Sequence, residues 1–213
     1  MDSGSAGFHR GNVFDGRFGA AVLLVALGAF TLRVFRLDAM GLELDEAFSV
    51  SFAHRGLAGI VQAGAASEPH PPLYYALLHG WYHLAGVAEF SLRLPSALAN
   101  VVTVVYLARL AATLAGRGPG LIAAGLLAVN PYQIWYSQDV RMYVPLGLFG
   151  LAAVYHATRA YRRGRRRDLA LYVIFILLGL YTHYYTLFLL CFLGALLFVA
   201  IWRRDGTDLT LRD

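Results

Sequence analysis

The stretch LYYALLHGWYHLAGV, residues Leu73–Val87, decides how this chain is arranged in a membrane. It is apolar enough to resemble a crossing, but it has only 15 residues, whereas a crossing helix needs about 20. The stretch also contains two histidines and four aromatic residues. Leucines recur on one helical face, while tyrosines and a histidine lie toward the other. We therefore predict an interfacial helix in the headgroup plane over residues 71–88.

The composition is that of an integral membrane protein. Of the 213 residues, 58% are hydrophobic and 15% are charged, whereas soluble domains carry about 25% charged residues. This composition excludes a disordered chain, because disorder requires low hydrophobicity and high charge. It also has too few polar residues to cover the surface of a water-soluble domain of this size. All 18 basic residues are arginines and the net charge is +5. The single cysteine excludes a disulfide framework.

Arginine positions support six crossings with the N-terminus in the cytoplasm. When Leu73–Val87 is not counted as a crossing, twelve arginines fall on the cytoplasmic side and five on the outer side, as the positive-inside rule requires. The expected fold is an all-α polytopic membrane protein with interfacial helices in a long first outer loop. The predicted crossings are 18–35, 94–115, 119–136, 143–161 and two within 169–202, divided at Thr182–Tyr185.

The same reasoning divides the chain into a cytoplasmic tail over 1–17, a transmembrane module over 18–202 and a cytoplasmic end over 203–213. The first outer loop covers about residues 37–93 and is far longer than an ordinary connection. Within it we predict a helix from Glu46 to about Ala63 with Asp45 as its N-cap. The adjacent carboxylates Asp45 and Glu46 are also candidates for acid–base catalysis.

Other unusual polar residues fall on the same predicted outer face. Glu68 and His70 lie in a proline-rich turn, which either fixes them over the bilayer or only stiffens the entry to the next helix. Arg93 either reaches lipid phosphates or binds a lipid-linked phosphate. His79 and His83 have the spacing of a metal pair, but Gly80 stands where a zincin needs glutamate, so we expect no metal there.

Two later outer turns add to this set. Asp139 and Arg141 lie in a short, polar and aromatic connection after the third predicted crossing, which is either a solvated turn or part of a site. His183 lies at the next outer turn, as an interfacial or a catalytic histidine. Three outer turns thus bring acids, histidines and arginines to one membrane face, which is the main functional signal in the residues themselves.

Five motifs, in order, resemble the GT-C class of membrane glycosyltransferases, and the family-39-like group most closely. That group includes protein O-mannosyltransferases, lipid A aminoarabinose transferases and rhizobial galacturonosyltransferases. The resemblance runs from about Phe18 to Trp202. It rests on Leu44-Asp45-Glu46, His70-Pro71-Pro72-Leu73-Tyr74, Arg93-Leu94-Pro95-Ser96-Ala97, the stretch from Tyr136 to Tyr143, and Tyr181-Thr182-His183-Tyr184-Tyr185.

The resemblance implies transfer of a sugar from a polyprenyl-phosphate donor to an acceptor on the outer face. It implies that Asp45 acts as the general base, with Glu46 beside it. It also implies that Arg93 and Arg141 bind the donor phosphate. Family members are much longer, so the chain is expected to be an N-terminal portion. Residues expected to line the cavity are Glu68, His70, Asp139, Tyr143 and His183.

The expected partners are a polyprenyl-phosphate-linked sugar, an envelope glycan, lipid or protein acceptor, and the lipid bilayer. We expect no cofactor and no nucleic acid, because the basic residues lie at membrane edges. The expected location is the plasma (inner) membrane. The alternative is a non-catalytic scaffold or a small multipass transporter. A transporter should carry ionisable groups at mid-membrane, whereas these spans are nearly free of charge apart from Arg109 and His156.

Overall fold

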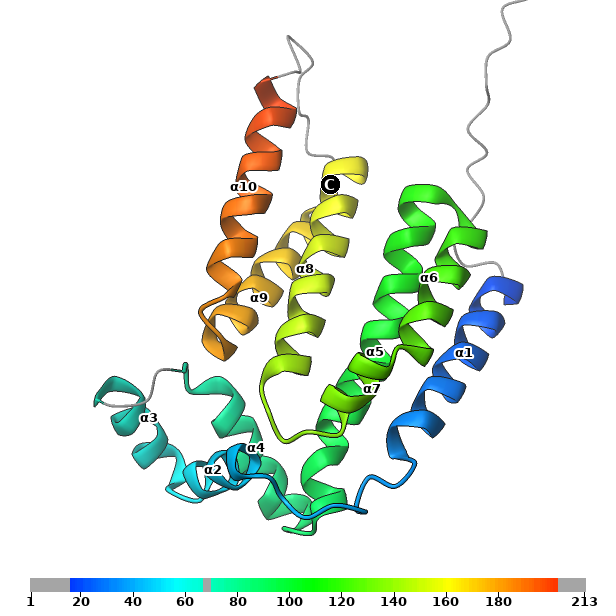
Figure 1. Ribbon diagram of the computed structural model, residues 1–213. Helices are drawn as coiled ribbons and strands as arrows, with labels where there is room; N and C mark the ends of the chain where they lie inside the picture. Colours follow the sequence, from blue (N-terminus) through cyan, green and yellow to red (C-terminus); the bar gives the residue numbers. More distant parts are fainter. Residues whose placement is uncertain (1–15, 67–69, 203–213) are drawn as a thin grey trace, which may run out of the picture.

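The computed structural model describes residues 16–66 and 70–202, and within these ranges the chain forms helices and no strands. The all-α expectation is therefore confirmed. Figure 1 shows the arrangement. The helices in chain order are α1 (Gly16–Val34), α2 (Leu44–Ala53), α3 (Gly56–Ala66), α4 (Leu73–Ala85), α5 (Glu89–Ala115), α6 (Arg117–Val129), α7 (Pro131–Ser137), α8 (Tyr143–Arg163), α9 (Arg166–Thr182) and α10 (Thr186–Trp202).

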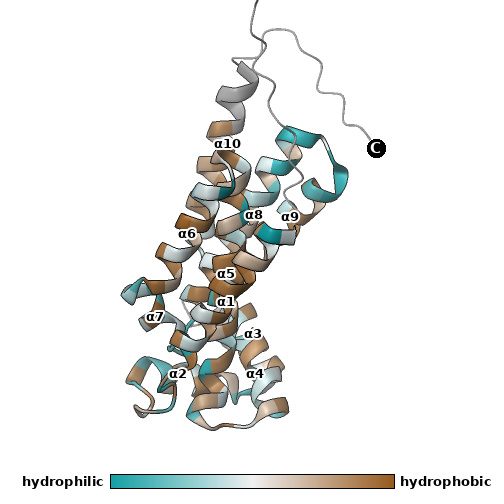
Figure 2. Cartoon of the chain, turned by 90° about the vertical axis from the view of Figure 1, so that its right-hand side faces the viewer, coloured by the Kyte–Doolittle hydropathy of each residue, from teal (hydrophilic) through white to brown (hydrophobic). Residues whose placement is uncertain are grey.

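The long helices stand side by side, and α2, α3 and α4 form a layer across one end of them (Figure 1). We call this end the α4 end. The opposite end, where Arg162–Arg167 joins α8 to α9, is called the arginine end. Figure 2 shows hydrophilic colouring where α8 and α9 meet and more hydrophobic colouring along the helices between the two ends. Helix α1 begins at the arginine end, whereas α5 begins beside α4 and ends at the arginine end (Figure 1).

Small residues hold α1, α5 and α6 together. Ala29, Ala108 and Ala124 are fully buried in one apolar cluster between these helices. At Gly120 an added Cβ would lie 2.7 Å from the carbonyl oxygen of Ala108, so only glycine lets the two backbones approach this closely. Close backbone approach through small residues is the usual packing mode of helices in lipid.

Two helices within the described ranges, α1 and α5, are long and apolar enough to cross a bilayer. Exposed leucines such as Leu23, Leu24 and Leu27 cover the outside of α1, which suits contact with lipid tails. The break at Thr182–Tyr185 is confirmed, because α9 ends at Thr182 and α10 begins at Thr186. Each of these two helices has 17 residues, so the number of six crossings stays a prediction.

The predicted crossing over residues 119–136 is not one continuous helix. It divides into α6 and the short α7 at Asn130. Pro131 has no N–H to continue the ladder, and the Asn130 side chain caps α7 by accepting from the Gln133 N–H at 3.1 Å. Arg33 of α1 donates to the carbonyls of Ala128 and Leu127 at 3.0 and 3.2 Å. The carbonyls freed at the end of α6 are thus satisfied by a buried arginine.

The prediction of one helix over residues 46–63 with Asp45 as its cap is also wrong. Helix α2 begins at Leu44, with Glu43 as the N-cap, and ends at Ala53. Gly56, with a positive φ of 74°, then starts α3 in a new direction. The Glu46 side chain accepts from the Glu43 N–H at 2.9 Å. Glutamate three residues after the cap therefore fixes this end, which is why Asp45 is left for other contacts.

A helix within the predicted range of residues 71–88 is confirmed as α4, Leu73–Ala85, with 13 residues. Its interfacial position in the membrane stays a prediction. This length gives about 20 Å, against a hydrocarbon core of about 30 Å. The aromatic face packs inward: Tyr75 is fully buried, and its ring lies 4.5 Å from that of Phe52. Leu77 and Leu84 point outward and are exposed. The apolar face of α4 is therefore open at the edge of the bundle.

Candidate functional site

The centre of the α4 end is an ion pair between Arg93 on α5 and Glu46 on α2. The Arg93 Nε donates to Glu46 Oε1 at 2.9 Å and the Nη2 donates to Oε2 at 2.6 Å. Three further contacts of the guanidinium, two from Nη1 and one from Nη2, go to backbone carbonyls of the loop that follows α1. These acceptors are Leu37 at 3.0 Å, Met40 at 2.7 Å and Gly41 at 3.1 Å.

These contacts match the full donor capacity of Arg93, because a guanidinium has five N–H groups. The residue is 5% exposed, so its guanidinium is almost wholly enclosed by these partners. In this arrangement Arg93 fastens α5 to α2 and to the loop over residues 37–41. The donor-phosphate role expected for Arg93 from the sequence stays a prediction.

Glu46 is saturated in the same way. It is 2% exposed, and it accepts from Arg93, from the Glu43 N–H and from the Val140 N–H at 3.0 Å. Although burial alone opposes the charged form, these hydrogen bonds and the nearby guanidinium lower the pKa of Glu46 below its usual value. A carboxylate held in this way is an anchor for the turn at Val140 and a poor proton acceptor.

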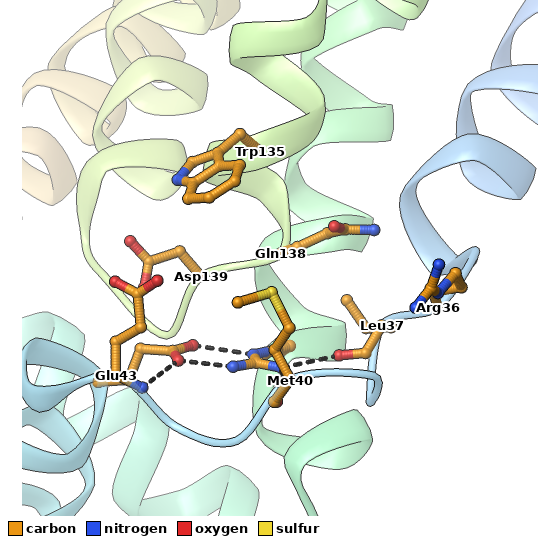
Figure 3. Close-up of a pocket in the computed structure, with 9 residues that line it drawn as sticks. Arg36, Leu37, Met40, Glu43, Trp135, Gln138 and Asp139 are labelled. Atoms are coloured by element: carbon orange, nitrogen blue, oxygen red, sulfur yellow. Dashed lines mark hydrogen bonds and ion pairs between the residues drawn. The ribbon is translucent and has the colours of Figure 1, made fainter.

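A small cavity of about 70 Å³ lies against this pair, and Figure 3 shows its lining. Ligand pockets usually measure about 300–1,000 Å³, so a sugar phosphate does not fit inside it. Asp139 enters from the turn between α7 and α8, and Glu43 enters from the start of α2. The remaining lining residues are Arg36, Leu37, Met40, Glu46, Arg93, Trp135 and Gln138.

Asp139 has an unusual electrostatic environment for a partly exposed carboxylate. Burial, followed by the negative charge of Glu46, raises the pKa of Asp139 to about 6, and Arg141 opposes this only in part. Its carboxyl group therefore changes charge close to neutral pH. The raised pKa makes Asp139 a candidate proton acceptor.

Arg141 contrasts with Arg93, because its contacts are few and long. Its Nη1 lies 3.3 Å from the Asp45 carbonyl oxygen and 3.4 Å from Ser49 Oγ, and its Nη2 lies 3.5 Å from the Tyr143 hydroxyl. Its Nε is buried and has no hydrogen-bond partner among the described residues. The guanidinium also lies over the Tyr143 ring at 5.5 Å. Arg141 therefore retains donors for an anion.

Asp45 is an accessible acid beside Arg141. Its side chain is 73% exposed, and its Oδ2 lies 3.8 Å from Arg141 Nη2. The sequence separates these two residues by almost a hundred positions, and the fold brings them together. Asp45, Asp139 and Arg141 thus form one group at the α4 end, beside the buried Glu46–Arg93 pair.

Two histidines border Arg141 on its other side. The rings of His70 and His183 lie 5.2 Å apart, and the ring of Tyr143 lies 6.3 Å from that of His183. The Tyr185 N–H donates to His183 Nδ1 at 3.1 Å, so in the neutral ring the proton is on Nε2. Burial and the nearby His70 and Arg141 lower the pKa of His183. A neutral His183 is therefore favoured.

The structure thus groups most of the residues expected from the sequence at one end. Asp45, Glu46, His70, Arg93, Asp139, Arg141, Tyr143 and His183 all lie at the α4 end, whereas Glu68 lies outside the described residues. Sequence reasoning missed Glu43, Ser49 and Gln138. The position of Glu43 three residues before Glu46 was the one available signal, since it fits a capping box.

A buried polar network that the sequence did not predict joins this site to the bundle. Arg33 donates to Asn100 Oδ1 at 2.7 Å, and the Asn100 Nδ2 donates to Gln133 Oε1 at 2.9 Å. The Gln138 Nε2 donates to the carbonyls of Arg33 and Phe35. These contacts tie α1, α5 and α7 together directly behind the turn that carries Asp139 and Arg141.

Comparison with known proteins defines the class. A family model described as dolichyl-phosphate-mannose-protein mannosyltransferase matches residues 69–210. The chain belongs to this family, and hence to the GT-C-type membrane glycosyltransferases. The match includes Arg93, Asp139, Arg141 and His183, while Asp45 and Glu46 precede it. No curated protein and no solved structure matches the chain.

Proposed function

We propose that the chain carries the donor and acceptor site of a sugar transferase that uses a polyprenyl-phosphate sugar. The observation that carries the proposal is the pairing of Arg141, a buried cation with unused donors, with the exposed carboxylate of Asp45 at 3.8 Å. Family membership supports a glycosyltransferase in general. The donor, the acceptor and the face of the membrane belong to the proposal.

In the proposed reaction, an acceptor hydroxyl attacks the anomeric carbon of the sugar. A new carbon–oxygen bond forms there as the bond to the donor phosphate breaks. Asp45 takes the hydroxyl proton, and polyprenyl phosphate leaves with the electron pair. Arg141 stabilises the charge that develops on the leaving phosphate. A base for the nucleophile and a cation for the leaving group are the two requirements of this displacement.

The roles of Arg93 and Glu46 in this proposal differ from those that the resemblance implied. Each has its hydrogen-bonding capacity filled by the other and by the backbone. We assign them to positioning, because Glu46 holds the Val140 N–H next to both Asp139 and Arg141. Glu46 thus fixes the turn, and Arg93 fixes Glu46. His183 and Tyr143 flank Arg141 and border the space for the donor.

The layer formed by α2, α3 and α4, which we call the α4 layer, supports a site at the membrane surface. Leu44, Phe48, Leu57 and Val61 are exposed on α2 and α3, as Leu77 and Leu84 are on α4. Exposed apolar side chains on short helices favour the interface between headgroups and acyl chains. A donor whose lipid lies in the bilayer then reaches Arg141 with its phosphate at headgroup depth. The arginine distribution supports the proposal that this surface lies on the outer face of the plasma membrane.

The test compares Asp45→Asn and Arg141→Gln in the membrane-embedded full chain, together with any further chain that completes it. The substrate is a set of polyprenyl-phosphate sugars, hexosyl and pentosyl, with envelope glycan, lipid or protein acceptors. Asp45→Asn should lower turnover by about 10²–10⁴-fold with donor binding little changed. Arg141→Gln should weaken donor binding as well as turnover. Asp38→Asn, an exposed acid in the loop after α1, is the matched control.

Normal turnover in Asp45→Asn, with the Asp38→Asn control also normal, would remove Asp45 from the mechanism. If Arg141→Gln bound the donor as well as the unsubstituted chain does, the phosphate assignment would be wrong. Substitution of Asp139 provides an internal comparison, because its raised pKa makes Asp139 a second candidate base at this end. A loss confined to Asp139→Asn would transfer the base role to that residue.

A further inference from the structure

The arginine end contains a second and larger cavity, of about 350 Å³, between α5, α8 and α9. Its size is within the range of pockets that hold small ligands. None of the residues of the site at the α4 end lines it. Four of its eleven lining residues are arginines: Arg109, Arg159, Arg165 and Arg167.

The charge of this cavity is strongly positive. Asp168 is the one acidic residue in its lining. Arg165 and Arg167 are exposed at its mouth, on either side of the first residue of α9. Several arginines around a concave surface are suited to phosphate oxygens, because the planar guanidinium donates two parallel hydrogen bonds.

Asp168 gives the cavity a second property. It is 3% exposed, and its Oδ1 faces His156 Nδ1 at 3.1 Å and Arg159 Nε at 2.9 Å. The contact with Arg159 is an ion pair without hydrogen-bond geometry. The Asp168 Oδ2 is buried and has no hydrogen-bond partner within the described part of the chain. A buried carboxylate oxygen left in this state costs free energy until a donor reaches it.

The remaining wall is apolar and faces the bundle. Val102 and Val105 on α5 and Leu171 on α9 line it. Figure 2 shows the same change along α8 and α9, from hydrophilic at their junction to more hydrophobic farther along the helices. The cavity thus combines a cationic mouth, an unpartnered acceptor and an apolar wall. These features match the phosphate, a headgroup hydroxyl and the acyl chains of an anionic lipid.

We propose that this cavity binds a phosphate ester that carries a free hydroxyl group, as in the glycerol headgroup of an anionic phospholipid. The phosphate lies between Arg165 and Arg167, and a headgroup hydroxyl donates to Asp168 Oδ2. The acyl chains then leave along Val102, Val105 and Leu171. The site is independent of the proposed transfer reaction, because it lies at the other end of the bundle. Free glycerol phosphate presents the same chemistry, so the experiment must separate the two sources.

The test titrates the purified full chain in a nonionic detergent and counts bound lipid by native mass spectrometry. Three lipids with the same acyl chains are compared: phosphatidylglycerol, phosphatidylmethanol and phosphatidylcholine. Phosphatidylmethanol has the same charge as phosphatidylglycerol but no hydroxyl. We expect phosphatidylglycerol to bind about tenfold more tightly than phosphatidylmethanol, as a hydrogen bond to a charged group predicts. Phosphatidylcholine should bind most weakly.

The variants use the arginines of the α8–α9 junction. Replacing both mouth arginines, Arg165→Gln with Arg167→Gln, should weaken phosphatidylglycerol binding about twentyfold, because each basic residue near an anionic headgroup contributes roughly fivefold. The matched control, Arg163→Gln with Arg166→Gln, removes the same charge from the same segment at two positions that do not line the cavity. It should change binding less than threefold.

Free glycerol 1-phosphate decides the source of the ligand. If it displaces the lipid at millimolar concentration and binds alone with the same dependence on Arg165 and Arg167, the site takes a soluble phosphate ester. If it fails to do so, the site takes the lipid. Equal binding of all three lipids would overturn the proposal. So would an equal loss in the mouth variant and in the control, because the effect would then be one of net charge alone.

Discussion

Arg93 on α5 and Glu46 on α2 are joined by two parallel hydrogen bonds of 2.9 and 2.6 Å, and both side chains are at least 94% buried. The pair closes the α4 end of the bundle. Its outer neighbours, Asp45 on α2 and Arg141 in the turn before α8, face each other at 3.8 Å, with the Asp45 side chain 73% exposed and the Arg141 side chain 10% exposed. One acid–arginine pair thus organises the backbone, and the second is the pair that we propose for chemistry.

This division predicts different outcomes for substitutions at the two pairs. Arg93→Gln leaves the Glu46 charge buried without its partner, which typically costs about 3–5 kcal/mol. We expect a clear fall in the melting temperature of the purified protein and a lower yield. Arg141→Gln breaks only long contacts and should lower the melting temperature far less. The measurement is thermal unfolding in detergent, followed by intrinsic fluorescence.

The double variant Glu46→Gln with Arg93→Gln is the control for the stability prediction. Removing both charges should recover part of the loss, because no isolated charge then remains in the interior. If Arg93→Gln unfolded at the same temperature as the unsubstituted protein, the pair would not anchor α2 and α5. The assignment of Arg93 to positioning would then fail.

Asp139 predicts a pH dependence of stability. Its folded pKa of about 6 lies above the ordinary value of 3.8, so between these values the folded state binds more protons than the unfolded state. Its contribution is therefore fully present below about pH 4 and is lost as the pH rises through about 6. We expect Asp139→Asn to gain in melting temperature relative to the unsubstituted protein between pH 4.5 and 7.5.

Asp38→Asn is the comparison for this measurement, since Asp38 is exposed in the loop after α1 and lines neither of the two cavities described above. It removes one carboxylate from the same end of the bundle. A difference in melting temperature for Asp139→Asn that did not change with pH would contradict the raised pKa of Asp139. Neither burial nor the negative charge of Glu46 would then act on its carboxyl group.

The buried cation Arg33 gives a third prediction. Arg33 is fully buried and donates to Asn100 and to the carbonyls at the end of α6. Arg33→Met should destabilise the protein by several kcal/mol, because two carbonyls and an amide oxygen lose their donors together. Arg36→Met, three residues later and exposed, should have little effect. Equal melting temperatures for the two variants would contradict the capping role of Arg33.

The sequence predicted best where the signal was local. The short helix at residues 73–85 and the break at Thr182–Tyr185 follow from helix length and from polar residues in an apolar run. Asn130–Pro131 also indicated a helix break, because proline cannot continue the hydrogen-bond ladder. The apolar residues on both sides nevertheless favoured the prediction of one continuous crossing. Its partner Arg33 lies almost a hundred residues away, so no local pattern could show which group satisfies the freed carbonyls.

The candidate site was predicted as a set of residues but not as a set of roles. Outer turns brought Asp45, Arg93, Asp139 and Arg141 into one expected group, and the fold does bring them together. Which arginine is saturated and which has unused donors depends on backbone carbonyls of residues 37–41. Residue spacing does not show such backbone contacts, so the sequence alone assigned Arg93 and Arg141 the same phosphate-binding role.

The topology provides the last prediction. If α1 and α5 cross the bilayer and α4 does not, Asp38 and Val87 lie on one side and Arg117 lies on the other. Cysteines placed at these positions in a Cys191→Ser background should react with a membrane-impermeant maleimide in this pattern. Val87 is preferred to Gly86, because Gly86 has a positive φ of 83° and a side chain there is strained. Intact cells and permeabilised cells are compared.

The position of Asp38 makes this experiment decisive for α4. Labelling of cysteines at Val87 and Arg117 alone tests whether α5 crosses the bilayer. The result of that labelling is the same whether or not α4 crosses. Asp38 precedes the α4 layer and Val87 follows it, so the two react from opposite sides only if that layer contains a crossing. Such a result would place Asp45 and Arg141 across the membrane from each other, in conflict with their separation of 3.8 Å. Labelling of Asp38 and Val87 from outside, with Arg117 protected, would instead place the proposed transfer site on the outer face.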